Sequence, residues 1–288
     1  MTTNYNIKKI ISSIKSELKD FYPDNEINSF VYLIFEKIAG IARTRLLISD
    51  QEELSEKQYK KIHGILMQLK SYKPIQYILG ETEFYELPFK VGEGVLIPRP
   101  ETEELVDWII KENKNNCKEI LDIGTGSGCI AIALAENLKS SKVYACDVSD
   151  TALSLAKQNS RKNDAEISFF HLDILSPNLD LDKKFDVVVS NPPYVTEGEK
   201  KLMEQNVLAF EPELALFVPD DNPLVFYKAI VNFSKSYLNH GGEIYLEINE
   251  AFGRQMVDLL NRSGFDPVIL KKDMSGKDRM IKGILKKN

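Results

Sequence analysis

Apolar side chains recur at the α-helical period of three or four positions in the first eighty residues of the chain. One helix face with this spacing is formed by Ile7, Ile10, Ile11, Ile14 and Leu18. A second helix is expected over about residues 25–39. The capping box Ser55-Glu56-Lys57-Gln58 predicts a third helix, which ends near Leu69. We therefore expect residues 1–80 to form a small helical bundle.

Between residues 81 and 97 the pattern changes to short apolar stretches around two glycines. Residues 84–91 and 95–97 flank Gly92-Glu93-Gly94. Two apolar stretches on either side of a glycine-containing turn are typical of a β-hairpin. We expect a hairpin linker over residues 81–97, with its turn at these glycines.

From residue 98 onward, predicted helices and strands alternate. Pro98-Arg99-Pro100-Glu101-Thr102-Glu103 leads into a helix, and its acidic residues suit a helix N-terminus without any catalytic role. Seven apolar stretches are predicted to be strands, at 119–123, 142–147, 166–171, 185–190, 242–248, 267–271 and 279–285. Such alternation predicts an α/β fold, in which a seven-stranded, doubly wound (Rossmann-like) sheet has helices on both faces. The connection around 273–278 is too short for a helical crossover, so the last strand is expected to be antiparallel.

A glycine-rich segment follows the first of these strands. Gly124-Thr125-Gly126-Ser127-Gly128 comes directly after the strand that contains Asp122, and an apolar helix is expected to begin at Cys129. Glycines at such a turn allow a ligand to approach the backbone closely beside a helix N-terminus. We expect Thr125, Ser127 and the three glycines to bind a cofactor.

The spacing of the glycines favours one cofactor over another. A dinucleotide site has the pattern Gly-x-Gly-x-x-Gly, but Cys129 stands at the third glycine position. Closely spaced glycines suit S-adenosylmethionine, which has no pyrophosphate, and Asp122 is then expected near its ammonium group. Asp147 lies about 20 residues beyond the glycines, where it is expected to bind the ribose hydroxyls. Asp173 is expected to accept from the adenine amino group, and Ile174 to pack on the ring.

Asn191-Pro192-Pro193-Tyr194 follows an apolar stretch that predicts a buried strand. The two prolines end the strand and restrict the backbone direction. The Asn191 oxygen and the Pro192 carbonyl can both accept from a planar NH2 group, and Tyr194 can stack on it. The tetrapeptide is therefore a candidate catalytic and substrate-binding segment, in which Asn191 also borders the cofactor. Taken alone, it could equally be a structural turn with a capping asparagine.

Composition sets further limits on the function. The chain has 288 residues, 43% hydrophobic content and a formal net charge of -6, which argues mildly against a dedicated nucleic-acid-binding protein. Its three cysteines and three histidines have no metal-ligand spacing, so no metal is expected. We find no signal or transit pattern at the start and no apolar stretch of membrane-spanning length. A cytoplasmic protein that does not associate with membranes is expected.

Several segments resemble the release factor glutamine methyltransferases, the PrmC/HemK family. They include Pro74-Ile75-Gln76-Tyr77-Ile78-Leu79-Gly80, Glu83-Phe84-Tyr85, the segment from Pro98 to Glu103, the segment from Asp122 to Gly128, Ser190 to Tyr194, Phe210-Glu211-Pro212 with Ala215-Leu216, and Asp273 to Arg279. The resemblance extends along nearly the whole chain. It implies the class I methyltransferase form of the predicted sheet.

The resemblance also implies a substrate. Members of this family methylate the side-chain amide of the glutamine in the Gly-Gly-Gln motif of class-1 peptide chain release factors. Two positions depart from the family pattern: Asn249 replaces a frequent glycine after Glu247-Ile248, and Asn222-Pro223 replaces a glycine after Asp221. Both lie outside the cofactor and amide segments, so altered loops are expected rather than altered chemistry.

Two other functions use the same residues. One is an N6-adenine or N2-guanine methyltransferase on DNA or RNA, because Asn-Pro-Pro-Tyr also occurs in enzymes that act on a flipped-out base. That function would need a basic groove near Tyr194, and Lys200 and Lys201 are too few to make one. The other is a binding module without activity, against which the intact glycine, aspartate and asparagine positions argue. The favoured interpretation is a monomeric enzyme that binds no nucleic acid directly and docks release factors on residues 1–80.

Overall fold

A computed structural model describes residues 5–46, 52–176 and 181–286 of the chain. The chain divides into two compact units. The first comprises Met1–Gly80 with Glu204–Phe210, and the second comprises Glu81–Met203 with Glu211–Asn288. Each unit has its own core and is described by itself.

The first unit is helical, as the sequence predicts. Its helices are α1 (Ile7–Leu18), α2 (Asp24–Ala39), α3 (Arg43–Leu46), α4 (Glu56–Leu69), α5 (Ile75–Leu79) and α9 (Gln205–Phe210). The predicted capping box at α4 is confirmed: the Gln58 amide donates to the Ser55 hydroxyl at 3.3 Å, and the Ser55 amide donates to Gln58 Oε1 at 2.9 Å. The predicted face of α1 is largely buried, with Ile14 and Leu18 completely enclosed.

The second unit contains the predicted seven-stranded sheet. Its strands are β3 (Glu119–Ile123), β4 (Lys142–Asp147), β5 (Ile167–His171), β6 (Phe185–Ser190), β9 (Leu238–Glu247), β10 (Phe265–Lys272) and β11 (Asp278–Leu285). Their spatial order is β10-β11-β9-β6-β3-β4-β5. The last strand, β11, is antiparallel to both of its neighbours, whereas the pairs among β9, β6, β3, β4 and β5 are parallel. The predicted fold class is confirmed.

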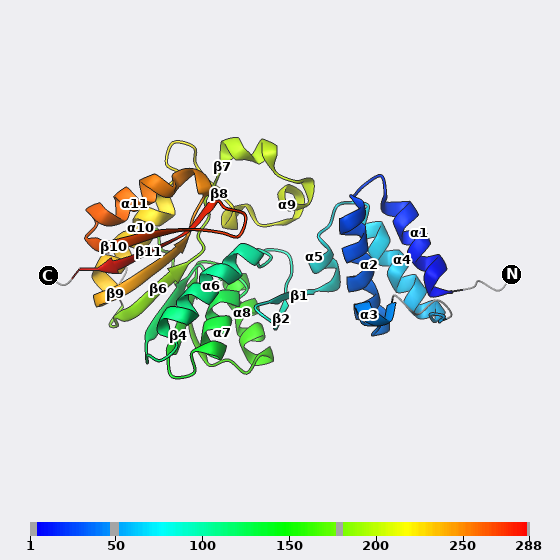
Figure 1. Ribbon diagram of the computed structural model, residues 1–288, viewed down its shortest axis with the longest axis horizontal. Coiled ribbons are helices and arrows are strands. Elements are labelled where there is room, and N and C mark those ends of the chain that lie inside the picture. The colour runs from blue at the N-terminus through cyan, green and yellow to red at the C-terminus, as the bar shows by residue number, and fades with distance from the viewer. Residues whose placement is uncertain (1–4, 47–51, 177–180, 287–288) are drawn as a thin grey trace. The chain divides into compact units, whose positions relative to one another are not determined.

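Helices cover both faces of this sheet, as Figure 1 shows. They are α6 (Pro100–Asn113), α7 (Cys129–Asn137), α8 (Asp150–Lys162), α10 (Val225–Tyr237) and α11 (Gly253–Arg262). Neighbouring strand residues belong to opposite cores: Ile120 packs in one cluster with residues of α6 and α7, and Leu121 packs in another with residues of α10 and α11. Burial on both faces explains why these strands are continuously apolar in the sequence.

The hairpin lies earlier in the chain than predicted. β1 (Glu81–Phe84) pairs with β2 (Leu87–Lys90), so the turn is Tyr85-Glu86 and not the segment at Gly92–Gly94. Both turn residues have positive φ, 50° and 62°, which matches the twist of a two-residue hairpin although neither residue is glycine. Residues 91–99 form no strand. The hairpin belongs to the second unit, where Asn159 of α8 bonds to both the amide and the carbonyl of Lys90.

Short elements complete the second unit. They are β7 (Val195–Thr196), β8 (Phe217–Val218) and the 3-10 helices η1 (Glu197–Leu202), η2 (Glu213–Ala215) and η3 (Glu250–Phe252). Across the described parts of both units, no helix has the length and apolar character needed to cross a membrane. Within the same residues, no group of three or more His, Cys, Asp or Glu side chains could hold a metal ion.

Candidate active site

A cavity opens at the edge of the sheet where the parallel strands β3, β4 and β6 end. The lining includes eight of the ten residues predicted to bind a cofactor: Gly124, Thr125, Gly126, Ser127, Asp147, Asp173, Ile174 and Asn191. Pro192 and Pro193 of the predicted substrate segment also line it. The carboxyl ends of parallel strands are where such sheets bind ligands.

The glycine loop is held by the backbone of the neighbouring strand. The amides of Gly124 and Thr125 both donate to the carbonyl oxygen of Cys146, at 2.9 and 3.0 Å. The amide of Gly126 donates to Asp147 Oδ2 at 2.9 Å. All three glycines of the loop have positive φ, a conformation that favours residues without a Cβ. The loop is therefore fixed against β4 before any ligand binds.

Gly128 supports the loop from behind. It does not appear in the cavity lining, which differs from its predicted role as a direct ligand contact. Its φ is 84°, and a Cβ added here would lie 3.1 Å from side-chain atoms of Ile132 and Ala156. The loop can enter α7 and pack against α8 only because this position has no side chain.

Asp147 lines the cavity and keeps free hydrogen-bonding capacity. Its Oδ2 accepts from Gly126, and its Oδ1 accepts from the Ser149 amide at 2.9 Å. An ionised carboxylate has about four lone-pair sites. Two sites therefore remain for hydroxyl groups of a ligand in the cavity.

Asp173 and Ile174 line the cavity just after β5. Asp173 is exposed, and its Oδ1 accepts from the Leu175 amide at 2.9 Å, which holds the carboxylate in a local turn. Ile174 adds a partly buried apolar wall. An acceptor beside an apolar wall suits the edge and face of an adenine ring.

Asp122 lies beneath the glycine loop and does not face the cavity. The residue is completely buried and does not appear in the lining. Its Oδ2 accepts from the Thr125 hydroxyl at 2.6 Å. Burial raises the pKa of Asp122 to about 7, against hydrogen bonds from Thr125 and the Ala131 backbone that lower it. Asp122 therefore supports the loop through Thr125, in place of the direct contact with an ammonium group that we expected.

Asn191 is oriented by Thr102, for which the sequence predicted no role in the site. Its Nδ2 donates to Thr102 Oγ1 at 3.1 Å, and the Thr102 hydroxyl donates to Glu247 Oε2 at 2.6 Å. Thr102 lies in the first turn of α6, and Glu247 is the last residue of β9. Ser190 anchors the end of β6 through a hydrogen bond of 2.6 Å to the Ile123 carbonyl oxygen. Asn191 is thus fixed from two sides.

Tyr194 does not appear in the lining of the cavity. Its ring packs against the apolar cluster on the α10 and α11 side of the sheet, and its hydroxyl donates to Glu247 Oε1 at 3.0 Å. Burial raises the pKa of Tyr194, so the hydroxyl stays protonated and donates. The structure places this residue as a support of the segment, which departs from the stacking on substrate that we expected.

An ion pair joins two further parts of the cavity wall. The Arg99 guanidinium lies 2.6 Å from Glu211 Oε1, and the Ile97 amide donates to Glu211 Oε2 at 3.3 Å. Arg99 and Pro212 both line the cavity. Arg99 and Thr102 lie in the segment from Pro98 to Glu103, and Glu211 lies in Phe210-Glu211-Pro212; both segments carried the family resemblance. The signal was therefore present in the sequence, although we interpreted the first segment only as a helix start.

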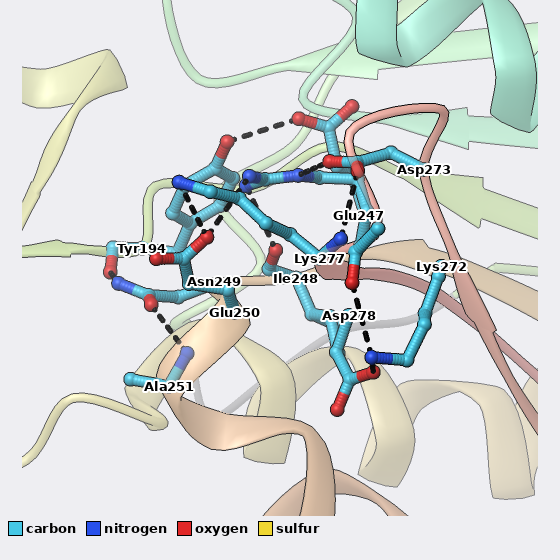
Figure 2. Close-up of polar contacts among 12 residues, drawn as sticks. Tyr194, Glu247, Ile248, Asn249, Glu250, Ala251, Lys272, Asp273, Lys277 and Asp278 are labelled. Carbon is cyan, nitrogen blue, oxygen red and sulfur yellow. Dashed lines mark hydrogen bonds and ion pairs between the residues drawn. The ribbon is translucent and has the colours of Figure 1, made fainter.

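The two departures from the family pattern occupy different surroundings. Asn249 Nδ2 donates to the Tyr194 carbonyl oxygen at 3.1 Å, and its Oδ1 accepts from the Ala251 amide at 2.9 Å (Figure 2). Asn249 also contacts Glu199 at 3.2 Å. Asn222 accepts from Lys228 Nζ at 2.9 Å in an exposed turn. Asn249 therefore reaches the active-site segment, and Asn222 does not.

These residues fit S-adenosylmethionine. The loop presents backbone close to the cavity, Asp147 keeps lone pairs for hydroxyls, and Asp173 with Ile174 provides an acceptor and an apolar wall. Asn191 lies in the same cavity, so a bound cofactor and an NH2 group could meet there.

Two family models match the chain. The Methyltransferase small domain matches residues 102–211, and the PrmC N-terminal domain matches residues 9–80. The first match spans the glycine loop and the Asn191 segment, and the second lies entirely within the helical unit.

Curated relatives match over almost the full length. The release factor glutamine methyltransferase of Flavobacterium psychrophilum is 48% identical over 281 residues, which cover 96% of this chain and 98% of the relative. The enzyme of the same name from Bacteroides thetaiotaomicron is 43% identical over 275 residues, covering 96% and 99%.

The chain is also similar in fold to a solved methyltransferase. A 16S rRNA N2 methyltransferase of Thermus thermophilus, solved in complex with AdoMet and guanosine, matches with a TM-score of 0.52 and 15% sequence identity. The match covers 72% of this chain and 50% of that one. At this identity the similarity shows a shared fold and does not distinguish a protein substrate from a nucleic acid.

Proposed function

The chain belongs to the release factor glutamine methyltransferases, and from that premise we propose how its residues carry out the reaction. The activity is the methylation of a release factor glutamine with S-adenosylmethionine as methyl donor. The observation that carries this function is the match of relatives over both units, because the fold of the second unit alone would serve other methyl acceptors. The glutamine is proposed to be that of the Gly-Gly-Gln motif in class-1 release factors.

The cofactor would be held by the glycine loop, Asp147, Asp173 and Ile174. Bound there, it supplies an activated methyl group on a sulfonium. Asp147 would accept from the ribose hydroxyls with the lone pairs that Gly126 and Ser149 leave free. Asp122 acts indirectly, because its hydrogen bond to Thr125 fixes the loop from below.

Asn191 and Pro192 would hold the substrate amide. The Asn191 side-chain oxygen and the Pro192 carbonyl oxygen each accept one N–H of the glutamine NH2 group. This arrangement fixes the plane of the amide and stabilises the positive charge that grows on its nitrogen during attack. Pro193 restricts the backbone so that the carbonyl keeps its direction. No general base is required, because a methylated amide nitrogen with positive charge loses a proton readily.

The alternative is methylation of an adenine or guanine amino group in DNA or RNA. A planar base NH2 group could make the same two hydrogen bonds. The experiment is to incubate the enzyme and labelled cofactor with a release factor, with that factor carrying alanine in place of the Gly-Gly-Gln glutamine, and with total nucleic acid. We expect label on the intact factor only. Label confined to nucleic acid would overturn the proposed function.

We propose that the first unit docks the release factor. Apolar side chains stand exposed on it, with Leu33 40%, Met67 57% and Leu208 39% exposed. Contacts far from the reacting group can position a protein substrate. In the full chain, Met67→Ser should raise KM for the intact factor several-fold and leave kcat/KM for a short Gly-Gly-Gln peptide unchanged. Lys61→Ser, exposed on the same helix, is the control. An unchanged KM for Met67→Ser would contradict docking at Met67.

We further propose that the enzyme acts as a cytoplasmic monomer without direct binding of nucleic acid. Every residue that lines the cavity comes from the second unit of a single chain, so the site needs no second copy. A formal charge of -6 opposes non-specific association with nucleic acid. Light scattering of the free enzyme tests the first point, because a mass well above 32.8 kDa would contradict a monomer.

A further inference from the structure

Glu247 is a buried acid that the transfer described above does not use. It is 1% exposed at the end of β9. Each of its carboxylate oxygens accepts from a different hydroxyl: Oε2 from Thr102 at 2.6 Å and Oε1 from Tyr194 at 3.0 Å. Figure 2 shows the second of these bonds. Both donors belong to segments that surround Asn191.

Glu243, a second acid on β9, has a purely structural role and can be compared with Glu247. Glu243 pairs with Lys282 on β11 at 2.8 Å, inside a cluster that also contains Tyr245. There the buried Lys282 cation balances a partly buried carboxylate between two strands. Glu247 instead accepts from two neutral hydroxyls, one from Thr102 in the cavity wall and one from Tyr194 in the segment that carries Asn191. Burial of a charge there is costly and suggests a function beyond joining strands.

The carboxylate sets the direction of a hydrogen-bond chain. An ionised carboxylate can only accept, so the single hydroxyl proton of Thr102 must point to Glu247. The Thr102 oxygen can then only accept from Asn191. Asn191 must present its NH2 group to Thr102, which leaves its oxygen as the atom available to the cavity. A reversed Asn191 would present N–H donors to the NH2 group of the substrate.

Both carboxylate oxygens of Glu247 accept hydrogen bonds from hydroxyl groups, which is the arrangement of an ionised carboxylate. Burial raises the pKa of Glu247, and the hydrogen bonds of Thr102 and Tyr194 and the charge of Arg279 oppose this rise. Arg279 on β11 is held by Asp273, whose Oδ2 lies 3.1 Å from Nε. A hydrogen-bond chain that ends on a charge also polarises its members. Asn191 thereby becomes a better acceptor at its oxygen.

We propose that Glu247 is the positioning residue of the amide site, which through Thr102 turns the Asn191 oxygen toward the substrate and through Tyr194 fixes the segment that carries it. This inference rests on the proposed function of Asn191 as an acceptor. It assigns Thr102, the threonine of the Pro-Arg-Pro-Glu-Thr-Glu segment, to the link between the two residues.

The decisive comparison is Thr102→Val against Thr102→Ser. Valine has nearly the shape of threonine but cannot accept from Asn191, whereas serine keeps the hydroxyl. We expect Thr102→Val to lower kcat on the release factor by about 10- to 100-fold, as removal of a polar partner near a reacting group does. The Kd of the cofactor and KM for the factor should change less than about threefold. Thr102→Ser should stay within about threefold of the wild-type kcat.

Glu247→Gln tests the direction of the chain. Glutamine has the same shape but can donate to Thr102, so Asn191 is no longer held in one orientation. We expect kcat to fall about tenfold, with little change in KM. Glu243→Gln is the matched control on the same strand: it should lower the thermal midpoint and leave kcat unchanged.

The outcomes separate this inference from the proposed function. No methylation of the factor by the wild-type enzyme would overturn the function itself. Wild-type methylation together with a normal kcat in Thr102→Val, or an equal loss in Thr102→Ser, would overturn only the positioning role. If Glu247→Gln does not fold, the threonine pair still decides, because thermal unfolding and cofactor affinity report whether those variants are intact.

Discussion

The two halves of the active site are built by different means. The cofactor half is a backbone structure, in which amides of Gly124, Thr125 and Gly126 bond to the end of the neighbouring strand. The amide half is a side-chain structure, in which Asn191 depends on Thr102, and Thr102 on Glu247. The two backbone bonds to Cys146 persist when a side chain of the loop is replaced, whereas a chain of side chains fails when any one member is lost. The two halves should therefore respond differently to mutation.

The largest expected effect is on the amide half. Asn191→Ala removes an acceptor aimed at the reacting NH2 group and leaves the glycine loop intact. Turnover should fall about 10²- to 10³-fold, as it does when one preorganised hydrogen-bond partner is deleted. Cofactor affinity, measured by calorimetry, should fall much less. A variant with near-normal turnover would show that Asn191 is only a turn residue and would remove the contrast between the halves.

The difference between the halves also decided what the sequence could predict. The glycine loop and Asp147 follow successive strands within about 25 positions, so a local pattern gave both of them. Thr102 and Glu247 are separated by 145 positions, and Thr102 and Asn191 by 89. No periodicity or motif links residues at such distances. The sheet order, which puts β9 beside β6, and the packing of α6 against β9 bring them together.

Local sequence patterns did not predict how deeply a residue is buried, and burial decides what its side chain can contact. Asp122 has the right position in the sequence, but a strand buried on both faces encloses it completely. The turn at Tyr85-Glu86 contains no glycine, whereas Gly92 and Gly94 lie a few residues later. The predicted turn was therefore placed wrongly at these glycines. The seven strands and the antiparallel β11 were predictable, because continuous apolar stretches and a short last connection leave few alternatives.

The second prediction concerns pH and the buried acid below the loop. The pKa of Asp122 is raised from 3.8 to about 7, so the neutral form predominates in the folded protein below about pH 7. Folding then loses stability as pH rises from about 4 through 7, by roughly a few kcal/mol. Asp122→Asn keeps an acceptor for Thr125 and should raise the thermal midpoint at pH 8. At pH 4 its midpoint should equal that of the wild type.

The same substitution should separate stability from binding. Below pH 7 the wild-type acid is increasingly neutral, so a positively charged cofactor above the loop should bind more weakly as pH falls. Asp122→Asn should remove most of this pH dependence of Kd. The charged neighbour that shares the site is Asp147, which opposes ionisation of Asp122. A pH-independent wild-type Kd between pH 5 and 8 would argue against any electrostatic role of Asp122 in binding.

The third prediction concerns the cofactor half directly. Asp147→Ala removes two lone-pair sites for ribose and the acceptor for the Gly126 amide. We expect Kd for the cofactor to rise about 10- to 100-fold, since charge-assisted hydrogen bonds are each worth about 1.5–3 kcal/mol. The loop keeps its two bonds to Cys146, so the domain should stay folded. At saturating cofactor, kcat should change little, in contrast to Asn191→Ala. Equal losses of kcat in Asp147→Ala and Asn191→Ala would show that the cofactor half and the amide half do not respond differently to mutation.

The smallest expected effect lies at Asn249, where this chain departs from the family pattern. Its side chain holds the Tyr194 carbonyl oxygen and caps the Ala251 amide, so it stiffens the segment that carries Asn191 without touching the cavity. Asn249→Gly restores the glycine frequent in the family and should lower kcat by only about two- to fivefold, because Glu247 still holds the Tyr194 hydroxyl.

The measurement is kcat in Asn249→Gly, in Tyr194→Phe and in the double variant. If both bonds serve the same segment, the double variant should lose more than the product of the two single losses. If the loss in the double variant equals the product of the two single losses, the bonds from Asn249 and Tyr194 do not support each other. Asn191 would then depend only on the hydrogen bonds from Glu247 through Thr102.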